Sequence, residues 1–130
     1  MKFKYKKYGL DTLRPVIPIE IKYNNLSVPY EVLVDSGADI CIFNAQIADV
    51  LGINISKGIK VQVGGMTGFP EDTYIHTLHI KIGGRIYKID VGFMRMSRSS
   101  YGVVGQKGFF NKFIVKFDLV KEEIEIKERI

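Results

Sequence analysis

Apolar and polar positions alternate along most of the chain with the two-residue period of β-strands. This alternation predicts strands over residues 15–23, 26–34, 74–82, 85–93, 113–120 and 122–130. Between them, Asn24-Asn25 and Gly83-Gly84 are residues that tolerate the positive φ of tight turns, and 118–122 holds the last turn. The pattern therefore predicts an all-β chain rich in hairpins.

One segment has helical spacing instead. In "AQIADVL", residues 45–51, the apolar side chains of Ile47, Val50 and Leu51 fall on one helical face. Asn44 before them is a favourable N-cap, and Gly52 after them is a favourable C-terminal stop. A second, shorter turn of helix is predicted at "GFFNKF", residues 108–113. The predicted fold class is therefore all-β with one or two short helices.

Composition is that of a single folded domain over residues 1–130. The chain is 46% hydrophobic and 25% charged, which excludes global disorder. Its net charge of +5 owes much to the lysines of residues 1–13. This stretch is either an edge strand with solvated lysines or a basic N-terminal extension. Nucleic-acid binding by these lysines is the less favoured interpretation, because no nucleic-acid motif accompanies them.

The sequence also indicates a compartment. No apolar run approaches the length of a membrane span or resembles the core of a signal peptide, so we expect a cytoplasmic protein with no membrane association. A single cysteine, Cys41, excludes an intrachain disulfide framework and favours a reducing environment. Because Cys41 lies in an apolar run, we expect a small buried side chain and not a reactive thiol.

Asp35 is the residue that the strand pattern does not explain. It directly follows the apolar run Val32-Leu33-Val34 and directly precedes Ser36-Gly37. Carboxylates are seldom fully buried, because removing one from water costs several kcal/mol unless a partner compensates. Asp, Ser and Gly are also common turn formers, so a plain loop is one interpretation. The context of the triplet favours another.

"VLVDSGAD", residues 32–39, resembles the Asp-Thr/Ser-Gly-Ala hallmark of the retropepsin-like aspartic proteases. "GVVGQKGFF", residues 102–110, resembles the late apolar pair and glycine of the same family. Between them, "VQVGGMTGFPEDTY", residues 61–74, resembles its glycine-rich flap. The order and spacing agree over residues 15–126. The Ile- and Lys-rich, Trp-free composition is more similar to that of a free-standing microbial member.

The resemblance implies an acid-protease β-barrel and an aspartic endopeptidase that needs no metal or organic cofactor. Asp35 would be the catalytic carboxylate, with Ser36 supporting the turn by a hydrogen bond and Gly37 leaving room for backbone to approach. Two carboxylates that share a proton can activate water and protonate the peptide carbonyl. Because the chain has one such triplet, the resemblance implies a homodimer in which two copies of Asp35 meet.

Further positions follow from the same resemblance. The expected substrate-binding residues are Ala38, Asp39, Gly64, Gly65, Met66, Thr67 and Gly68. The last five form the expected flap, for which an ordinary hairpin turn is the alternative. Asp39 pairs with an arginine in retroviral members, but Gln106 stands at that position here. Substrate contact and loop stabilisation therefore remain equal alternatives for Asp39.

Packing roles are expected for three other groups. Residues 103–105 would pack against the active-site loop, and Ile42, Met66 and Phe69 would line apolar pockets. A metal site is not expected, because His76 and His79 fall on opposite faces of a strand without nearby ligands.

The pattern leaves two further questions open. Either the first strand or residues 122–130 would provide the dimer sheet. The alternative to a peptidase acting on a peptide or protein substrate is a catalytically silent dimerisation or peptide-binding module.

Overall fold

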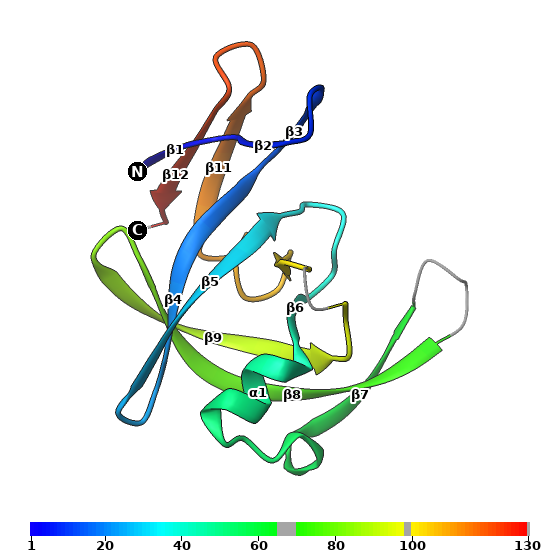
Figure 1. Cartoon of the computed structure of the whole chain (residues 1–130). Coiled ribbons are helices and arrows are strands. Elements are labelled where there is room, and N and C mark those ends of the chain that lie inside the picture. Colours follow the sequence, from blue (N-terminus) through cyan, green and yellow to red (C-terminus); the bar gives the residue numbers. More distant parts are fainter. Residues whose placement is uncertain (65–69, 98–99, 130) are drawn as a thin grey trace.

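Strands joined by short turns make up most of the computed structural model, which describes residues 1–64, 70–97 and 100–129 (Figure 1). Within these residues, the main sheet has the strand order β4-β5-β10-β6-β9-β8-β7. Its members are β4 (Val16–Tyr23), β5 (Leu26–Val34), β6 (Cys41–Asn44), β7 (Ile59–Gly64), β8 (Pro70–Ile82), β9 (Arg85–Met94) and β10 (Gly102–Val104). A further pairing of β4 with β8 closes the sheet into a barrel, with β7 outside the closure. The predicted all-β barrel is confirmed.

The turns lie where the sequence predicts them. Asn24, between β4 and β5, has φ 51°, and Gly83 and Gly84, between β8 and β9, have φ 57° and 92°. Such conformations are accessible to Asn and Gly at little cost, which fixes the position of each hairpin. β5 has the predicted bounds, whereas β8 begins at Pro70, four residues earlier than predicted.

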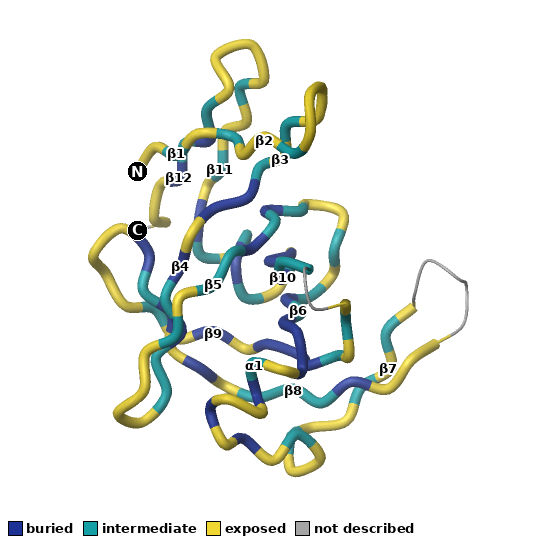
Figure 2. Tube along the Cα trace, in the orientation of Figure 1, coloured by how far each residue is buried: buried dark blue, intermediate teal, exposed yellow. Residues whose placement is uncertain are grey.

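The buried residues, dark in Figure 2, lie mainly on the strands of the barrel, with others within residues 45–53 and 109–126. β4 contributes Ile17, Ile19 and Ile21, each at most 4% exposed. Phe43 from β6 and Phe109 from the turn after β10 are fully buried. Each such side chain stabilises the fold by about 1.5–3 kcal/mol through its removal from water.

Helix α1 (Ala45–Leu51) has the predicted bounds. Asn44 accepts a hydrogen bond from the backbone N–H of Gln46 at 3.1 Å, and Gly52 ends the helix with φ 75°. The buried face is Ala45, Ala48 and Leu51, and Val50 of the predicted apolar face is 63% exposed. Two alanines and one leucine thus form the face that packs on the sheet. A 3₁₀ turn, η1 (Ile55–Lys57), follows.

The second predicted helix is reduced to one hydrogen-bonded turn. The N–H of Phe113 donates to the carbonyl of Phe109 at 3.0 Å, but β11 begins at Phe113 and ends the turn there. At the other end, Gly108 has φ 104°, which is incompatible with a helix. Residues 108–113 therefore contain a single hydrogen-bonded turn and no second helix.

The chain ends form a separate three-stranded sheet in the order β1-β12-β11. Its strands are β1 (Lys2–Lys4), β11 (Phe113–Asp118) and β12 (Glu123–Glu128), and a short hairpin of β2 (Lys6–Tyr8) and β3 (Thr12–Arg14) follows β1. The lysine-rich start is therefore strand and not a loose tail. Since β12 has a neighbour on each edge, β1 and β11 carry the open edges of this sheet among the described residues.

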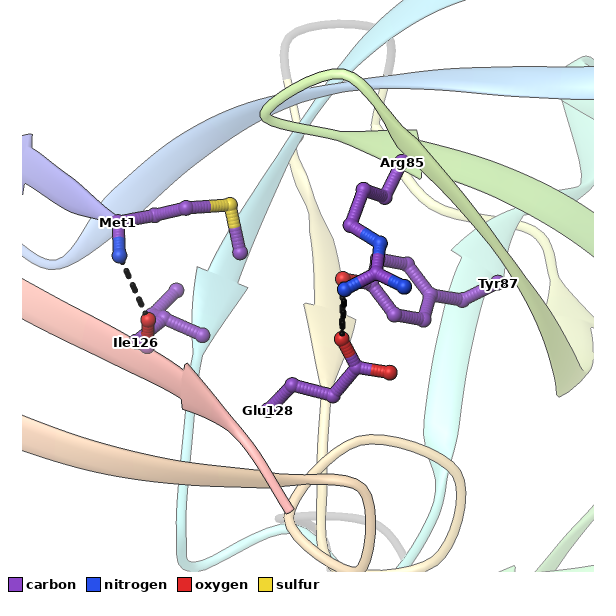
Figure 3. A network of polar contacts seen from close by, with 5 residues as sticks. All are labelled: Met1, Arg85, Tyr87, Ile126 and Glu128. Atoms are coloured by element: carbon purple, nitrogen blue, oxygen red, sulfur yellow. Dashed lines mark hydrogen bonds and ion pairs between the residues drawn. The ribbon is translucent and has the colours of Figure 1, made fainter. Parts of the chain in front are cut away.

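Polar contacts connect this sheet to the barrel (Figure 3). The carboxylate of Glu128 accepts hydrogen bonds from Arg85 at 2.8 Å and Tyr87 at 3.4 Å, both on β9. Within the terminal sheet itself, the N-terminal ammonium of Met1 donates to the carbonyl of Ile126 on β12 at 2.8 Å. In the described part of the chain, no helix is long and apolar enough to cross a membrane.

Candidate active site

Asp35 follows the last residue of β5 and lies next to the end of β10. These two strands pair in parallel, with Val34 opposite Val104. The N–H of Asp35 donates to the carbonyl of Val104 at 3.0 Å, and the N–H of Val34 donates to the carbonyl of Pro15 at 2.9 Å. The backbone that carries Asp35 is therefore fixed from both sides.

The carboxylate of Asp35 is half-buried and turns back over its own loop. Its Oδ1 accepts a hydrogen bond from the N–H of Gly37 at 2.9 Å. A Cβ at position 37 would lie 3.2 Å from this oxygen, which is a tight contact. Glycine at position 37 therefore lets the Asp35 carboxylate lie close to the backbone without strain. No contact to Oδ2 is found among the described residues. One oxygen is thus anchored and the other is available.

Ser36 contributes its backbone and not its side chain. Its carbonyl accepts a hydrogen bond from the side-chain Nε2 of Gln106 at 2.6 Å. Its hydroxyl is exposed and makes no hydrogen bond within the described part of the chain. The turn is therefore supported by the side chain of Gln106 and not by the Ser36 hydroxyl. From the sequence, Gln106 is notable only because it stands where retroviral members have an arginine.

Residues 35–40, called the active-site loop below, are held by the segment after β10. The N–H of Gln106 donates to the carbonyl of Ala38 at 2.8 Å, and the N–H of Lys107 donates to the carbonyl of Asp39 at 3.0 Å. Gly105 fits tightly beneath, because a Cβ there would lie 2.5 Å from the Ala38 oxygen and 2.6 Å from that of Ile40. The predicted packing of residues 103–105 on the loop is confirmed.

Cys41 lies at the centre of this contact. Its Sγ accepts from the N–H of Gly105 at 3.4 Å and donates to the carbonyl of Lys107 at 3.5 Å. Burial, with a smaller contribution from the charge of Asp90, raises the pKa of the Cys41 thiol from 9.0 to about 11. Cys41 is fully buried, as predicted, and is a packing residue.

Asp39 is exposed and forms no ion pair among the described residues. An arginine at position 106 could pair with Asp39, but Gln106 stands there and donates to the Ser36 carbonyl instead. Asp39 borders a cavity between its own loop and β7.

This cavity, called the loop–β7 cavity below, has a volume of about 1010 Å³. Gly37, Ala38 and Asp39 of the active-site loop form one side, and residues 61–64 of β7 form the other. Ile42 lies between them, as expected for an apolar pocket residue. Gly64 is the last residue of β7, and Gly65, Met66, Thr67, Gly68 and Phe69 lie outside the described residues.

Sequence reasoning missed four charged residues that also line the loop–β7 cavity. They are Lys88 and Asp90 on β9 and Lys107 and Lys112 after β10. A strand alternation shows that Lys88 and Asp90 face outward, but it does not show what they face. A second cavity of about 510 Å³ is lined by Tyr8, Tyr30, Tyr101 and neighbours and contains none of the predicted site residues.

The described residues include no group of three or more His, Cys, Asp or Glu side chains placed to hold a metal ion. His76 is half-buried, with its Nε2 2.8 Å from the carbonyl oxygen of Ile55, whereas His79 is exposed. The two histidines of β8 therefore lie in different environments and do not form a common site.

Comparison with known proteins agrees with this geometry. A family model described as "Aspartyl protease" matches residues 18–107, which is more than half of the chain. The structure of EIAV protease complexed with the inhibitor HBY-793 is 25% identical, with a TM-score of 0.54 over 77% of this chain and 88% of that one.

A retropepsin-like aspartic protease from Rickettsia conorii shares the fold more extensively. Its TM-score is 0.66 at 17% identity, over 95% of this chain and 88% of that one. A comparison with curated protein sequences gives no significant match.

A closed β-barrel with an Asp-Ser-Gly loop held beneath by a glycine-containing strand end is the arrangement of an aspartic protease with a retropepsin-like fold. The chain belongs to the aspartyl protease family.

Proposed function

We propose that this protein is an aspartic endopeptidase that acts as a homodimer, with the carboxylates of two Asp35 residues, one from each chain, forming the catalytic dyad. The observation that carries the proposal is the set of hydrogen bonds that hold Asp35. Its backbone is fixed between β5 and β10, one carboxylate oxygen is anchored by Gly37, and the other is available. Membership of the aspartyl protease family supports a protease function.

A second chain is required because one carboxylate cannot perform both proton transfers. Glu31 and Asp39 are the nearest other carboxylates in sequence, but Glu31 pairs with Lys6, and Asp39 is exposed and borders the loop–β7 cavity. Under a two-fold axis, each residue near the axis meets its own copy. Two Asp35 side chains brought together in this way supply two equivalent carboxyl groups.

The chemistry follows from the repulsion between the two groups. Two carboxyl groups a few ångströms apart do not both ionise, because their negative charges would repel each other. The pair therefore shares one proton, as is established for aspartic proteases in general. The ionised carboxylate takes a proton from water while the water oxygen attacks the peptide carbonyl carbon. The protonated carboxyl group gives its proton to the carbonyl oxygen. Collapse of the resulting diol, with proton transfer to the amide nitrogen, breaks the C–N bond and restores the shared proton.

Neighbouring residues position the dyad and the substrate. Gln106 holds the Ser36 carbonyl, and Gly37 anchors Asp35, so both are positioning residues. Ala38 and Asp39 border the cavity where a substrate backbone would pass. Gly64 and the residues that follow it, 65–68, serve as a flap over the bound peptide, because hairpin lids exclude water and secure the substrate.

A subunit-mixing experiment tests the proposal directly. Wild-type protein and the variant Asp35→Asn are mixed in equal amounts, allowed to exchange subunits, and assayed on a diverse peptide pool. If both Asp35 residues are required, random pairing leaves about a quarter of the dimers active, whereas independent monomers retain about half of the activity.

Two measurements accompany the mixture. Sedimentation shows whether Asp35→Asn still dimerises, and the variant alone should not cleave. Cleavage by Asp35→Asn at the wild-type rate contradicts the mechanism. Absence of cleavage by the wild-type dimer favours the silent peptide-binding module.

A further inference from the structure

Three lysines from two segments line the loop–β7 cavity and are called the lysine wall below. Lys88 belongs to β9, and Lys107 and Lys112 belong to the turn between β10 and β11. The isolated bridge between Lys107 and Ile40 places this turn directly against the active-site loop. Distant parts of the chain thus bring positive charge to one side of the proposed substrate cleft.

These lysines are not neutralised by the protein. None of the three forms an ion pair among the described residues, although seven other ion pairs occur there. The cavity also holds two carboxylates, Asp39 and Asp90. Asp90 accepts a hydrogen bond from the hydroxyl of Thr77 at 2.6 Å, which partly satisfies it.

Apolar contacts complete the cavity. Ile42, Ile75 and Gly108 also line it. An aliphatic stem with an anionic end suits a cavity whose lining combines isoleucine side chains with three lysines. Glutamate has this combination, with a methylene stem and an anionic end.

We propose that the lysine wall of the loop–β7 cavity is a subsite for an acidic side chain of the substrate. This inference rests on the proposed function, since it assigns the substrate class of that same cleft. Lys88 and Lys107 are the specificity-determining residues, and Lys112 adds to the positive field. Because ion pairs near the surface contribute modestly, the preference for Glu over Gln is about 3- to 10-fold.

The two-fold axis of the proposed dimer extends the inference. Each subunit brings its own cavity, so the dimer has one on each side of the scissile bond. The preferred substrate therefore carries acidic residues at two positions placed symmetrically about the cleaved bond. A general attraction of acidic peptides to a protein of net charge +5 has no such dependence on position.

The experiment has a binding arm that does not depend on cleavage. Peptides with a single Glu moved through an otherwise neutral sequence, and the same series with Gln, are titrated against the Asp35→Asn protein by fluorescence polarisation. Each titration is repeated in the backgrounds Lys107→Glu and Lys88→Glu, which lie on different elements. Lys57→Glu is the matched control, since Lys57 is exposed on η1 and does not line the cavity.

The expected result is about 3- to 10-fold tighter binding of Glu over Gln at one symmetric pair of positions. Lys107→Glu and Lys88→Glu remove this preference, and Lys57→Glu retains it. Equal binding of Glu and Gln at every position overturns the proposal, as does a preference that Lys57→Glu removes equally.

A single-stranded oligonucleotide that binds with the same lysine dependence, while Glu peptides do not bind, makes the wall a phosphate site and also overturns the proposal. Cleavage of the same peptides by the wild-type protein is scored separately. Failure of the peptidase function is therefore distinguishable from failure of the acidic subsite.

Discussion

Gly105 has no room for a side chain beside Ala38, because a Cβ on Gly105 would lie 2.5 Å from the Ala38 carbonyl oxygen. The obstacle is backbone, which cannot rotate away. The same oxygen accepts the N–H of Gln106 at 2.8 Å, so moving it also weakens a hydrogen bond that holds the active-site loop. The glycine after β10 thus determines how closely the loop carrying Asp35 approaches its support.

Gly105→Ala should therefore destabilise the protein and displace the active-site loop. Forcing one methyl group into a packed region costs about 1–3 kcal/mol, and backbone as the obstacle places this case at the upper end. Urea denaturation gives the free energy of unfolding, and peptide cleavage gives the activity. Gly64→Ala is the control for stability, since nothing lies within 4 Å of a Cβ there. Equal stability of the two variants would contradict the close approach.

Gln106→Glu should lower activity with little loss of stability. Glutamate has the size of glutamine, but its ionised carboxylate cannot donate to the Ser36 carbonyl and repels it. One hydrogen bond of an exposed side chain is worth about 0.5–1.5 kcal/mol, so the melting temperature changes only slightly. Cleavage rates measured as kcat and KM separately should show the loss mainly in kcat. A loss confined to KM would instead place Gln106 in substrate binding.

The bounds of helices and turns were predictable, because they depend on residues adjacent in sequence. Burial was less predictable, because it depends on contacts between distant segments. The helix bounds follow from Asn44 and Gly52, which act on their own neighbours. The exposure of Val50 does not follow, because the width of the space under α1 depends on the sheet that packs against it. Of the three apolar residues at helical spacing, Leu51 is buried and Ile47 packs against the core, whereas Val50 is exposed.

The candidate site divides in the same way. Asp35, Ser36 and Gly37 are a contiguous motif, so the sequence predicts their turn, and the structure shows the anchored carboxylate. The lysine wall consists of residues 88, 107 and 112, which barrel closure brings to one cavity. No local pattern indicates that positions on a strand and a later turn will face the same space.

Asn44→Ala should destabilise the protein by about 1–2 kcal/mol without altering the hydrogen bonds that hold Asp35. The side chain of Asn44 both caps α1 at Gln46 and donates to the carbonyl of Ser97 at 3.1 Å. Because Asn44 is only 3% exposed, water does not replace these contacts. Thermal unfolding measures the loss, and Asn44→Asp is a useful companion. Aspartate retains the cap but buries a carboxylate oxygen against the Ser97 carbonyl, so this variant should be at least as destabilised as Asn44→Ala.

Cys41 should resist thiol reagents in the folded protein at neutral pH. The thiolate is the reactive form, and burial raises the pKa of the Cys41 thiol to about 11. Labelling with a chromogenic disulfide should be slow in buffer and fast in denaturant. Rapid stoichiometric labelling of the native protein would contradict the packing of Sγ between Gly105 and Lys107.

The same raised pKa predicts a loss of stability at alkaline pH. An unfolded thiol ionises near pH 8.5–9, about two units before the folded one, so the unfolded state loses its proton first. The contribution of Cys41 is therefore complete below about pH 8.5 and decreases toward pH 11, by on the order of 2 kcal/mol. Burial also raises the pKa of Tyr30, which adds to the loss at the alkaline end of this range. Cys41→Ala separates the two, because it lowers stability at neutral pH through the cavity that it leaves but should flatten the decline between pH 9 and 11. An unchanged slope in that variant would assign the alkaline loss to the tyrosines.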